Sequence, residues 1–358
     1  MEYKRLGEYI EPVDERNSKL EIKLSQGICN EKYFQDPRQV AENSAADKIV
    51  RRGYFAYNRA TTRNGEKISI AYREGPDCTV SSAYQVFRIK DEEKLNPKYL
   101  LMWYKRPDFD KYARFRSHGS AHEFFEYEEM CNVRIPLPSI ERQREIVSEY
   151  ETITNRIRLN NQMIQHLETT AQALYRKTFI DNIDKENLPE GWRMGTLGEV
   201  ATFKYGKLAE KHVRSTEFPY PVFSGYAVTG YTDEYTLKEP TIVIIARGDA
   251  GTGRICMSPK ECFLSNLAIA IETKDVTIKD YLYYHLLDSD TMSLRSGSAQ
   301  AQITINNVES FAIMIPLKDV CMDFSQKVEA LYNTILIHNQ ENEKLTELQS
   351  LLLAKMGQ

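Results

Sequence analysis

An internal repeat constrains the fold of this chain more than any other feature of its sequence. An Ile-Pro-Leu tripeptide stands at residues 135–137 and again at residues 315–317. Past each junction, from residue 139 and from residue 318, roughly forty residues follow without Gly or Pro, in the second copy until the last turn of the chain. Within these segments the pair Asn161-Gln162 aligns with Asn339-Gln340. The sequence therefore predicts two similar halves, each ending in a long helix.

Apolar residues recur in both long segments at alternating spacings of three and four residues. A stripe this narrow, sustained over about four heptads, is typical of a coiled coil rather than of a helix that covers a sheet. At 1.5 Å per residue each helix would be about 55–60 Å long, so we expect the helices to act as rigid spacers. The residues expected to form the pairing seam are Ile146, Tyr150, Ile153, Ile157, Asn160, Ile164, Leu167 and Leu174 in the first helix, and Phe324, Val328, Leu331, Ile335, His338, Leu345 and Leu352 in the second.

The segments upstream of the helices predict two domains that resemble each other more weakly. Both open on Leu-Gly-Glu, at residues 6–8 and 197–199. Short runs rich in β-branched and aromatic residues predict strands within residues 53–60, 66–73, 83–90, 241–248 and 266–273. Residues 96–109 and 278–290 each show the apolar spacing of a helix.

The expected fold class is therefore α+β. Two tandem α/β domains are each followed by a long helix, and the two helices pair as an antiparallel coiled coil with pseudo-two-fold symmetry. The predicted boundaries are residues 1–138 for the first domain, 139–180 for the first helix, 181–192 for a linker, 193–317 for the second domain and 318–358 for the second helix.

Composition excludes several classes of protein. No apolar run approaches the length of a membrane span and the first residues lack a secretory hydrophobic region, so we expect a cytoplasmic location and no membrane partner. The six cysteines and six histidines are scattered without metal-ligand spacing, so no metal site is expected. A net charge of −4 excludes a uniformly basic protein but is compatible with a local basic face that binds nucleic acid.

Two similar but non-identical domains on rigid spacers suit two related but different targets at a fixed separation. Half-sites on DNA have this geometry, because one face of the duplex recurs about every 34 Å. Antiparallel helices would present the two domains to the duplex with opposite polarity. The side chains that differ between the domains would then recognise the DNA sequence, while the helices fix the distance between the half-sites.

Basic and polar side chains in the loops of both domains are candidate DNA contacts, with an ordinary solvated loop as the alternative for each. Arginine can bind a phosphate or the edge of a guanine. Residues 105–121 alternate basic side chains with Tyr112 and Phe115, which we expect to anchor the segment to its domain. The candidates are Arg59, Arg63, Lys111, Arg114 and Arg116 in the first domain, and Arg247, Arg254, Arg295, Ser298, Gln300 and Gln302 in the second.

Two polar residues interrupt the seam near the midpoints of the helices. Asn160 and His338 occupy matched seam positions, so antiparallel pairing would place them opposite or next to each other. A buried polar layer costs stability but can fix the register of two helices. We therefore expect this layer to set the spacing between the domains, with a surface pair on a frayed seam as the alternative.

The order of these motifs resembles that of the specificity subunit of type I restriction–modification enzymes, over nearly the whole chain. The resemblance rests on the Leu-Gly-Glu openings, Leu-Pro-Glu-Gly-Trp at residues 188–192, the glycine-rich turn at residues 246–254, and Ile-Pro-Leu-Pro followed by Glu141 and Gln143. It implies a non-catalytic chain whose two target-recognition domains each read half of a bipartite site in double-stranded DNA.

The same resemblance implies partners and cofactors. The helices would set the spacing and dock two methyltransferase subunits, and restriction subunits would join through that complex. The chain itself would bind no cofactor, whereas the complex would use S-adenosylmethionine in its methyltransferase subunits and ATP and Mg in its restriction subunits. At the second junction Lys318 replaces the second proline and residues 321–324 lack the Glu and Gln, which puts in doubt the equivalence of the two docking surfaces.

Other functions remain open at this point. The partner could be a single chain that both methylates and cleaves, or the protein could be a coiled-coil scaffold that binds no DNA. Residues 96–99, Asn-Pro-Lys-Tyr, resemble the Asn-Pro-Pro-Tyr motif of amino-methyltransferases, but Lys98 breaks that motif. We interpret this segment as the start of a helix with Pro97 in its first turn.

Overall fold

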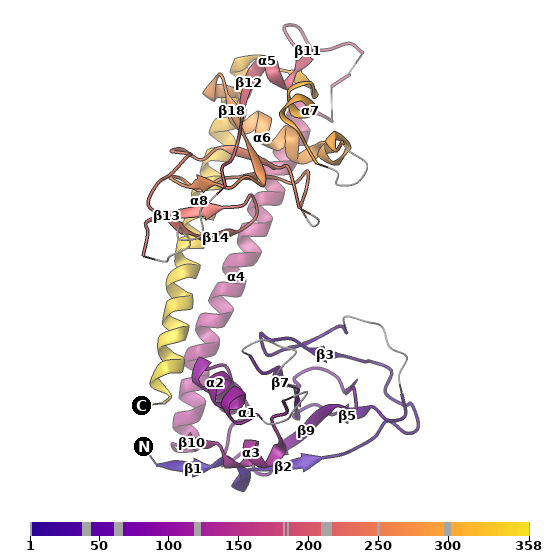
Figure 1. Ribbon diagram of the computed structural model, residues 1–358, viewed down its shortest axis with the longest axis vertical. Helices are drawn as coiled ribbons and strands as arrows, with labels where there is room; N and C mark the ends of the chain where they lie inside the picture. Colours follow the sequence, from indigo (N-terminus) through magenta and orange to yellow (C-terminus); the bar gives the residue numbers. More distant parts are fainter. Residues whose placement is uncertain are drawn as a thin grey trace. The chain divides into compact units, whose positions relative to one another are not determined.

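The computed structural model describes residues 2–37, 44–60, 67–117, 123–181, 183–184, 186–208, 217–248, 251–296 and 302–357. The chain forms two compact units (Figure 1), of which the first comprises Met1–Asn160 with Asn339–Gln358 and the second comprises Asn161–His338. The long helices α4 (Ile140–Phe179) and α8 (Lys318–Lys355) each contribute residues to both units. Among the described residues, no helix is long and apolar enough to span a membrane.

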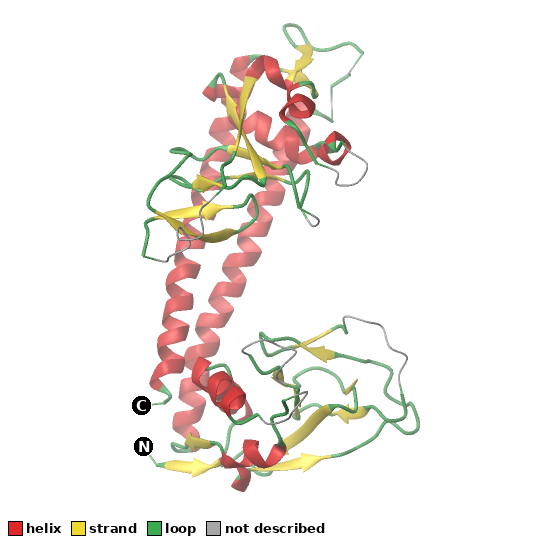
Figure 2. Ribbon diagram, viewed as in Figure 1, coloured by secondary structure: helices red, strands yellow, loops and turns green. Residues whose placement is uncertain are grey.

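A four-stranded antiparallel sheet forms the centre of the first domain (Figure 2). Phe55, Tyr57 and Phe87 are fully buried in it, and the Phe55 and Phe87 rings stack with centroids 5.1 Å apart. Aromatic and β-branched residues dominate these strands because they pack well on a pleated surface. The strand order is β2 (Ile10–Val13), β9 (Tyr84–Ile89), β6 (Phe55–Asn58) and β7 (Ile70–Tyr72). Shorter pairs join β1 (Tyr3–Arg5) to β10 (Arg134–Pro136), β3 (Gly27–Ile28) to β4 (Phe34–Gln35), and β5 (Lys48–Val50) to β8 (Cys78–Val80).

Short helices complete the first domain, namely η1 (Leu6–Glu8), α1 (Pro97–Tyr104), α2 (Pro107–Phe115) and α3 (Tyr127–Asn132). The prediction that a helix starts at Pro97 is confirmed, because the Asn96 side chain accepts from the backbone N–H groups of the first turn. The prediction of one helix over residues 96–109 is wrong, because α1 ends at Tyr104 and α2 begins at Pro107. Proline has no N–H and disfavours helical geometry in the preceding residue, and Arg106 is extended with ψ 135°.

The second domain is built on a sheet of the same design. Every residue of its central strand β15 is fully buried. Its strand order is β12 (Ala201–Tyr205), β18 (Ala268–Thr273), β15 (Ile242–Ile245) and β16 (Ile255–Met257). A second sheet has the order β14 (Val228–Thr232), β13 (Tyr220–Phe223) and β17 (Phe263–Leu264), and β11 (Arg193–Thr196) pairs with β19 (Ala312–Ile315). The helices are α5 (Leu197–Val200), η3 (Val276–Ile278), α6 (Lys279–Asp288), η4 (Thr291–Leu294) and α7 (Ile305–Glu309).

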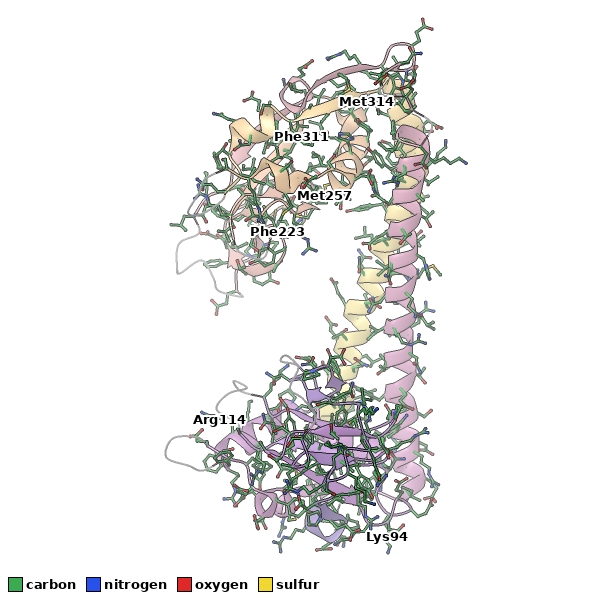
Figure 3. The ribbon with its side chains drawn as sticks, turned by 90° about the vertical axis from the view of Figure 1, so that its right-hand side faces the viewer. Lys94, Arg114, Phe223, Met257, Phe311 and Met314 are labelled. Carbon is green, nitrogen blue, oxygen red and sulfur yellow. The ribbon has the colours of Figure 1, made fainter. Side chains whose placement is uncertain are left out.

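The two domains share a topology despite their different sequences. If the four strands of each sheet are numbered along the chain, their order across the sheet is 1-4-2-3 in both domains. The strands predicted from β-branched and aromatic runs are confirmed as β6, β7, β9, β15 and β18. Met257, Phe311 and Met314 pack with the larger core of the second unit, whereas Phe223 belongs to a smaller buried cluster (Figure 3).

The repeated Leu-Gly-Glu motif has the same role in both domains. Leu6 and Leu197 are fully buried, and their backbone N–H groups donate to the carbonyls of Val133 and Phe311 at 2.8 and 2.9 Å. The glycine that follows each leucine allows close packing. A Cβ on Gly7 would lie 2.7 Å from the Cβ of a cysteine in α3, and a Cβ on the second glycine would lie 2.5 Å from the Cγ of a glutamate in α7.

Lysine and tyrosine side chains fix this packing at matched positions. Lys90 donates to the carbonyls of Gly7 and Glu8 at 3.1 and 3.2 Å, and Lys274 donates to the equivalent carbonyls of the second domain at 2.7 and 3.2 Å. The Tyr99 hydroxyl donates to the Pro136 carbonyl at 3.0 Å, and the Tyr281 hydroxyl donates to the carbonyl of Met314. The sequence repeat therefore corresponds to the same set of lysine and tyrosine hydrogen bonds in both domains.

Both long helices enter the core of each unit. In the first unit Val147 of α4 belongs to the main buried cluster, and Leu353 of α8 packs against it. In the second unit the Phe179 ring of α4 lies 5.3 Å from the Phe324 ring of α8 and meets it edge to face. Every residue of the predicted seam is buried or half-buried. Each end of the helix pair is thus part of a domain core.

The two junctions between domain and helix differ in chemistry. Gln143, near the start of α4, is fully buried and connects that helix to its domain by hydrogen bonds. Cys321 occupies the matched position in α8 and is buried as a small apolar residue. The second junction has an ion pair instead, between Lys318 and Asp275. This pair lowers the pKa of the Asp275 carboxyl to about 2, chiefly through the hydrogen bond from Lys318.

Candidate nucleic-acid interface

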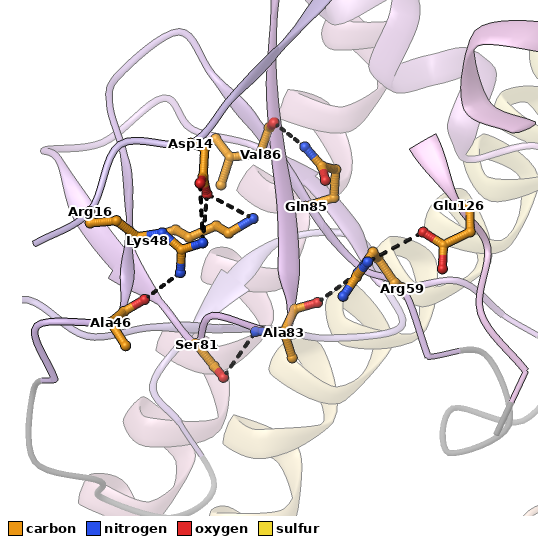
Figure 4. Close-up of polar contacts among 10 residues, drawn as sticks. All are labelled: Asp14, Arg16, Ala46, Lys48, Arg59, Ser81, Ala83, Gln85, Val86 and Glu126. Atoms are coloured by element: carbon orange, nitrogen blue, oxygen red, sulfur yellow. Dashed lines mark hydrogen bonds and ion pairs between the residues drawn. The ribbon is translucent and has the colours of Figure 1, made fainter. Parts of the chain in front are cut away.

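Arg59 lies immediately after β6, an inner strand of the first domain's sheet (Figure 4). Its Nη1 donates to Glu126 Oε2 and its Nε to the Ala83 carbonyl, both at 3.3 Å. Its guanidinium carbon lies 5.8 Å from the centre of the Phe124 ring. The side chain is held in place and remains one-third exposed, at 35%. A phosphate that replaced Glu126 as the partner of Arg59 would bind a guanidinium that the Ala83 carbonyl and the Phe124 ring already hold in position.

A second cationic cluster in the first domain was missed by sequence reasoning. Arg16 and Lys48 share the carboxylate of Asp14, at 2.9 and 3.2 Å (Figure 4). The hydrogen bond from Lys48, followed by that from Arg16, holds the pKa of the Asp14 carboxyl below its ordinary value. Two cations on one carboxylate leave a net positive charge. No local pattern predicts this cluster, because Arg16 and Lys48 come together only through pairing across the domain.

The described candidates of residues 105–121 lie on helix α2 or, for Arg116, at its C-cap. Arg114 forms an ion pair with Glu123, and Arg116 Nε lies 2.8 Å from Glu129 Oε2. Exposed Lys111 has no ion pair among the described residues. The predicted anchoring by aromatic residues is confirmed for Tyr112, whose ring packs against the core 6.2 Å from Phe125. It is wrong for Phe115, which is 80% exposed because the helix turns its side chain away from the domain.

Three candidates lie outside the described residues. They are Arg63 in the first domain and Ser298 and Gln300 in the second. Their neighbours Ser296 and Gln302 pair through both backbone hydrogen bonds at 3.0 Å, and the side chain of Gln302 is exposed.

The arginines of the second domain border the glycine-rich turn after strand β15. Arg247 and Arg254 are both exposed and have no ion pair among the described residues. Gly248 and Gly253 have φ values of 120° and 93°, a left-handed backbone that only glycine adopts without strain. The N–H of Gly253 donates to the Ile245 carbonyl at 2.8 Å and closes the turn.

A groove of about 770 Å³ brings Arg254 and Arg295 together in the second unit. Arg295 Nη2 donates to the Thr252 carbonyl at 2.8 Å, which joins the segment after η4 to the glycine-rich turn. Glu168 and Gln172 of α4 line the same groove, whereas Arg247 lies outside it.

A second groove, of about 440 Å³, lies in the first unit beside α2. Lys111 lines it, and so do Lys32, Lys67 and Lys105. Sequence reasoning missed Lys32 and Lys67, because each is far in sequence from α2 and neither falls in a basic run.

Asn160 is 2% exposed and is part of a polar layer in the first unit. Its Nδ2 lies 3.0 Å from both Glu341 Oε2 and Asn342 Oδ1 of α8. Arg156 Nε donates to Glu341 Oε1 at 2.7 Å and extends the layer. A buried polar layer is therefore present at Asn160, while its expected contact with His338 stays a prediction.

Comparisons with known proteins match both halves of the chain. The family model described as type I restriction modification DNA specificity domain matches residues 45–169 and 189–347. The type I restriction enzyme MjaIX specificity subunit of Methanocaldococcus jannaschii is 22% identical over 293 residues, covering 72% of this chain and 68% of that protein. The HindI specificity subunit of Haemophilus influenzae is 20% identical over 401 residues, covering 87% of each chain.

A solved structure shows the same fold. The S subunit of the type I restriction–modification system from M. genitalium superposes with a TM-score of 0.62 at 17% identity, over 99% of this chain and 95% of that chain. The expected mixed α/β fold with two tandem domains and long helices is confirmed. Because the family model matches both domains and most of both helices, this chain belongs to the type I restriction–modification DNA specificity family and is a non-catalytic DNA-recognition subunit.

Proposed function

We propose that the chain reads a bipartite site in double-stranded DNA, with one target-recognition domain for each half-site. The domains would occupy residues 1–138 and 193–317, with residues 181–192 as the linker. One observation carries the proposal: two domains share a strand order and matched supporting contacts but differ in the charged side chains of their loops. A common scaffold with different polar surfaces is what two readers of unlike half-sites require.

The helices within residues 139–180 and 318–358 would fix the distance between the half-sites. We propose that α4 and α8 pair as an antiparallel coiled coil with pseudo-two-fold symmetry. Contacts in the first unit support this direction, because Thr154 meets Gln349 whereas Asn160 meets Asn342. Residue numbers thus rise along α4 as they fall along α8, and the buried Asn160 layer would define the register.

The proposed DNA contacts fall into two groups. Arginines that now pair with carboxylates would exchange these partners for DNA, whereas cations that have no ion pair among the described residues would bind without rearrangement. The first group comprises Arg59, Arg114 and Arg116, and the second comprises Lys111, Arg247 and Arg254. Arg63, Arg295, Ser298, Gln300 and Gln302 remain proposed contacts on their position in the sequence.

The long helices would also dock two methyltransferase subunits, and restriction subunits would join through that complex. Large apolar side chains exposed on the helices support docking, because soluble surfaces rarely expose such groups together without a partner. On α8, Met322 and Tyr332 are 45% and 51% exposed and line a groove of about 480 Å³ against α6. S-adenosylmethionine, ATP and Mg would belong to the partner subunits rather than to this chain.

Methylome sequencing tests the proposal directly. Cells would express this chain with its methyltransferase subunits, and the same subunits with residues 193–317 exchanged for the matching segment of another family member. We expect a bipartite methylated motif in which the exchange alters one half and preserves the other half and the spacing. An exchange that alters both halves, or neither, would contradict one reader per half-site.

A mobility-shift assay separates this function from a scaffold that binds no DNA. Phosphate contacts make the affinity for duplex DNA fall steeply with salt concentration, whereas a protein scaffold shows no such dependence. If the assembled complex neither binds duplex DNA in a salt-dependent way nor produces a motif that depends on this chain, the DNA-reading proposal fails.

A further inference from the structure

The groove in the first unit is a built surface rather than a gap between loops. It is lined by α2, by the turn between β3 and β4, and by side chains from both long helices. The residues are Asn30, Glu31, Lys32, Lys67, Lys105, Pro107, Asp110, Lys111, Tyr150, Thr346, Gln349, Ser350 and Leu353. Four lysines and two carboxylates therefore share about 440 Å³ of space.

The two carboxylates are already neutralised. Asp110 pairs with Lys32 at 2.6 Å, and both side chains are about nine-tenths buried or more. Lys32 Nζ also donates to a backbone carbonyl at 3.1 Å. Glu31 pairs with Lys67 at 2.8 Å. The remaining lysines, Lys105 and Lys111, have no ion pair among the described residues and leave the groove with two uncompensated positive charges.

Lys105 is partly removed from solvent. Its ammonium lies 5.3 Å from the centre of the Tyr150 ring, and burial lowers the pKa of its side chain. The nearby carboxylates Glu74 and Glu151 both pair with Lys98, which neutralises one of their two charges, and both also raise the pKa of Lys105 against the larger effect of burial. An incoming anion would stabilise this partly desolvated cation further.

The groove of the second unit is its counterpart. The alignment that pairs the two long helices places Thr346 and Ser350 of the first groove on Glu168 and Gln172 of the second. Both grooves are bordered by the short helix or 3₁₀ turn that follows the main domain helix. Here Arg254 and Arg295 face a single carboxylate, that of Glu168, so the net charge is again positive but smaller.

We propose that these matched grooves bind the sugar–phosphate backbone of duplex DNA and do not read bases. This inference rests on the proposed function and assigns a separate role within it. Both kinds of cation suit a protruding phosphate, the lysine ammonium of the first groove as a point charge and the arginine guanidinium of the second as a planar fork. One groove in each unit would position the duplex against its reader independently of sequence.

The charge difference makes the proposal quantitative. Counted over the lining residues alone, the first groove has two more cations than carboxylates and the second has one more, so the first should contribute twice the salt dependence. Each phosphate contact contributes about 0.9 to the slope of log affinity against log salt. At about 0.1 M salt, loss of one contact should therefore weaken binding about eightfold.

The test uses the full chain assembled with its methyltransferase subunits. Binding to a duplex that carries the methylated motif, and to one of random sequence, is measured from about 50 to about 200 mM salt. Lys105→Gln with Lys111→Gln should reduce the slope by about 1.8, and Arg254→Gln by about 0.9, on both duplexes. Methylome sequencing should find the motif unchanged, and Lys105→Arg with Lys111→Arg should restore the slope.

Matched controls remove cations that already have a carboxylate partner outside the grooves. Lys94→Gln and Lys204→Gln leave Asp91 and Glu272 in solvent and should not alter the slope. Lys94 lies well apart from Arg114 of α2 in the first unit (Figure 3). Thermal melting of each complex establishes that the variants fold.

Three results would overturn the assignment. If a groove variant folds and keeps the wild-type salt dependence of DNA binding, no phosphate binds in that groove. An altered methylated motif would make the groove a base reader. Weaker association with the methyltransferase subunits at an unchanged slope would make it a protein contact. In each case the wild-type complex still binds DNA with a steep slope, whereas failure of the proposed function removes that slope from the wild type itself.

Discussion

Replacing Gln143 with leucine would test how the start of α4 is fixed to the first domain. The side chain is fully buried near the beginning of the helix. Its Nε2 donates to the carbonyls of Lys94 and Pro138, both at 3.0 Å, and its Oε1 accepts from the N–H of Asn96 at 2.8 Å. Because Asn96 caps α1, a single amide connects the first turns of two helices.

The expected loss follows from these three hydrogen bonds. Each contributes about 1 kcal/mol net, so their removal costs about 3 kcal/mol. Leucine recovers about 1 kcal/mol by burying more apolar surface, which leaves about 2 kcal/mol of destabilisation. For a unit of this size, each kcal/mol lowers the melting temperature by about 2–4 °C, so Gln143→Leu should lower it by about 4–8 °C.

Differential scanning calorimetry of the full chain measures this shift. Gln165→Leu is the matched control, because Gln165 lies on the same helix but is exposed. Exposed substitutions usually change stability by no more than about 0.5 kcal/mol. If Gln143→Leu melts within a degree of the control, the buried amide is not what holds this junction.

Three further predictions concern other features of the two units. Asn160→Leu should lower the free energy of unfolding by about 1–3 kcal/mol, and adding Asn342→Leu to that variant should recover most of the loss. Additive effects of the two substitutions in a double-mutant cycle would exclude the polar layer. Gly7→Ala should cost about 1–3 kcal/mol, because its Cβ would lie 2.7 Å from a Cβ in α3. An unchanged urea midpoint would show that η1 can move away from α3 at little cost. The pKa of Asp275 is lowered from 3.8 to about 2, so its ionised form stabilises the fold above about pH 4, and this stabilisation is lost as the pH falls toward 2. Lys318→Met should therefore weaken the dependence of melting temperature on pH between about 4 and 2. An identical pH profile would show that the ion pair has no such role.

Much of the fold could be predicted from local patterns. The β-branched runs, the capped start of α1 and the long stretches free of Gly and Pro correctly predicted β6, β7, β9, β15, β18, the start of α1 and the two long helices, because each pattern acts within a few residues. The break between α1 and α2 was missed, although Pro107 marks it, since apolar spacing alone continues across the proline. Here local backbone chemistry outweighed the periodicity.

The candidate site was less predictable. The pattern of basic residues on α2 gives the composition of the segment but not the carboxylates that meet it, such as Glu123 and Glu129. Lys32 follows Glu31 in the turn between β3 and β4, and nothing near it in the sequence indicates its buried pair with Asp110. Such pairs join residues far apart in the chain, and their formation depends on burial that only packing creates.

The sequence by itself determined the duplication, the long helices and the family, because these depend on periodicity and on motifs in a fixed order. The tertiary structure decided which cations of the described residues have a carboxylate partner. Lys105 and Lys111 have no ion pair there, because Lys32 and Lys67 pair with the two carboxylates that line the groove and Lys98 pairs with Glu74 and Glu151. Charge balance in a groove is a sum over residues brought together by folding, so it has no local signature in the chain.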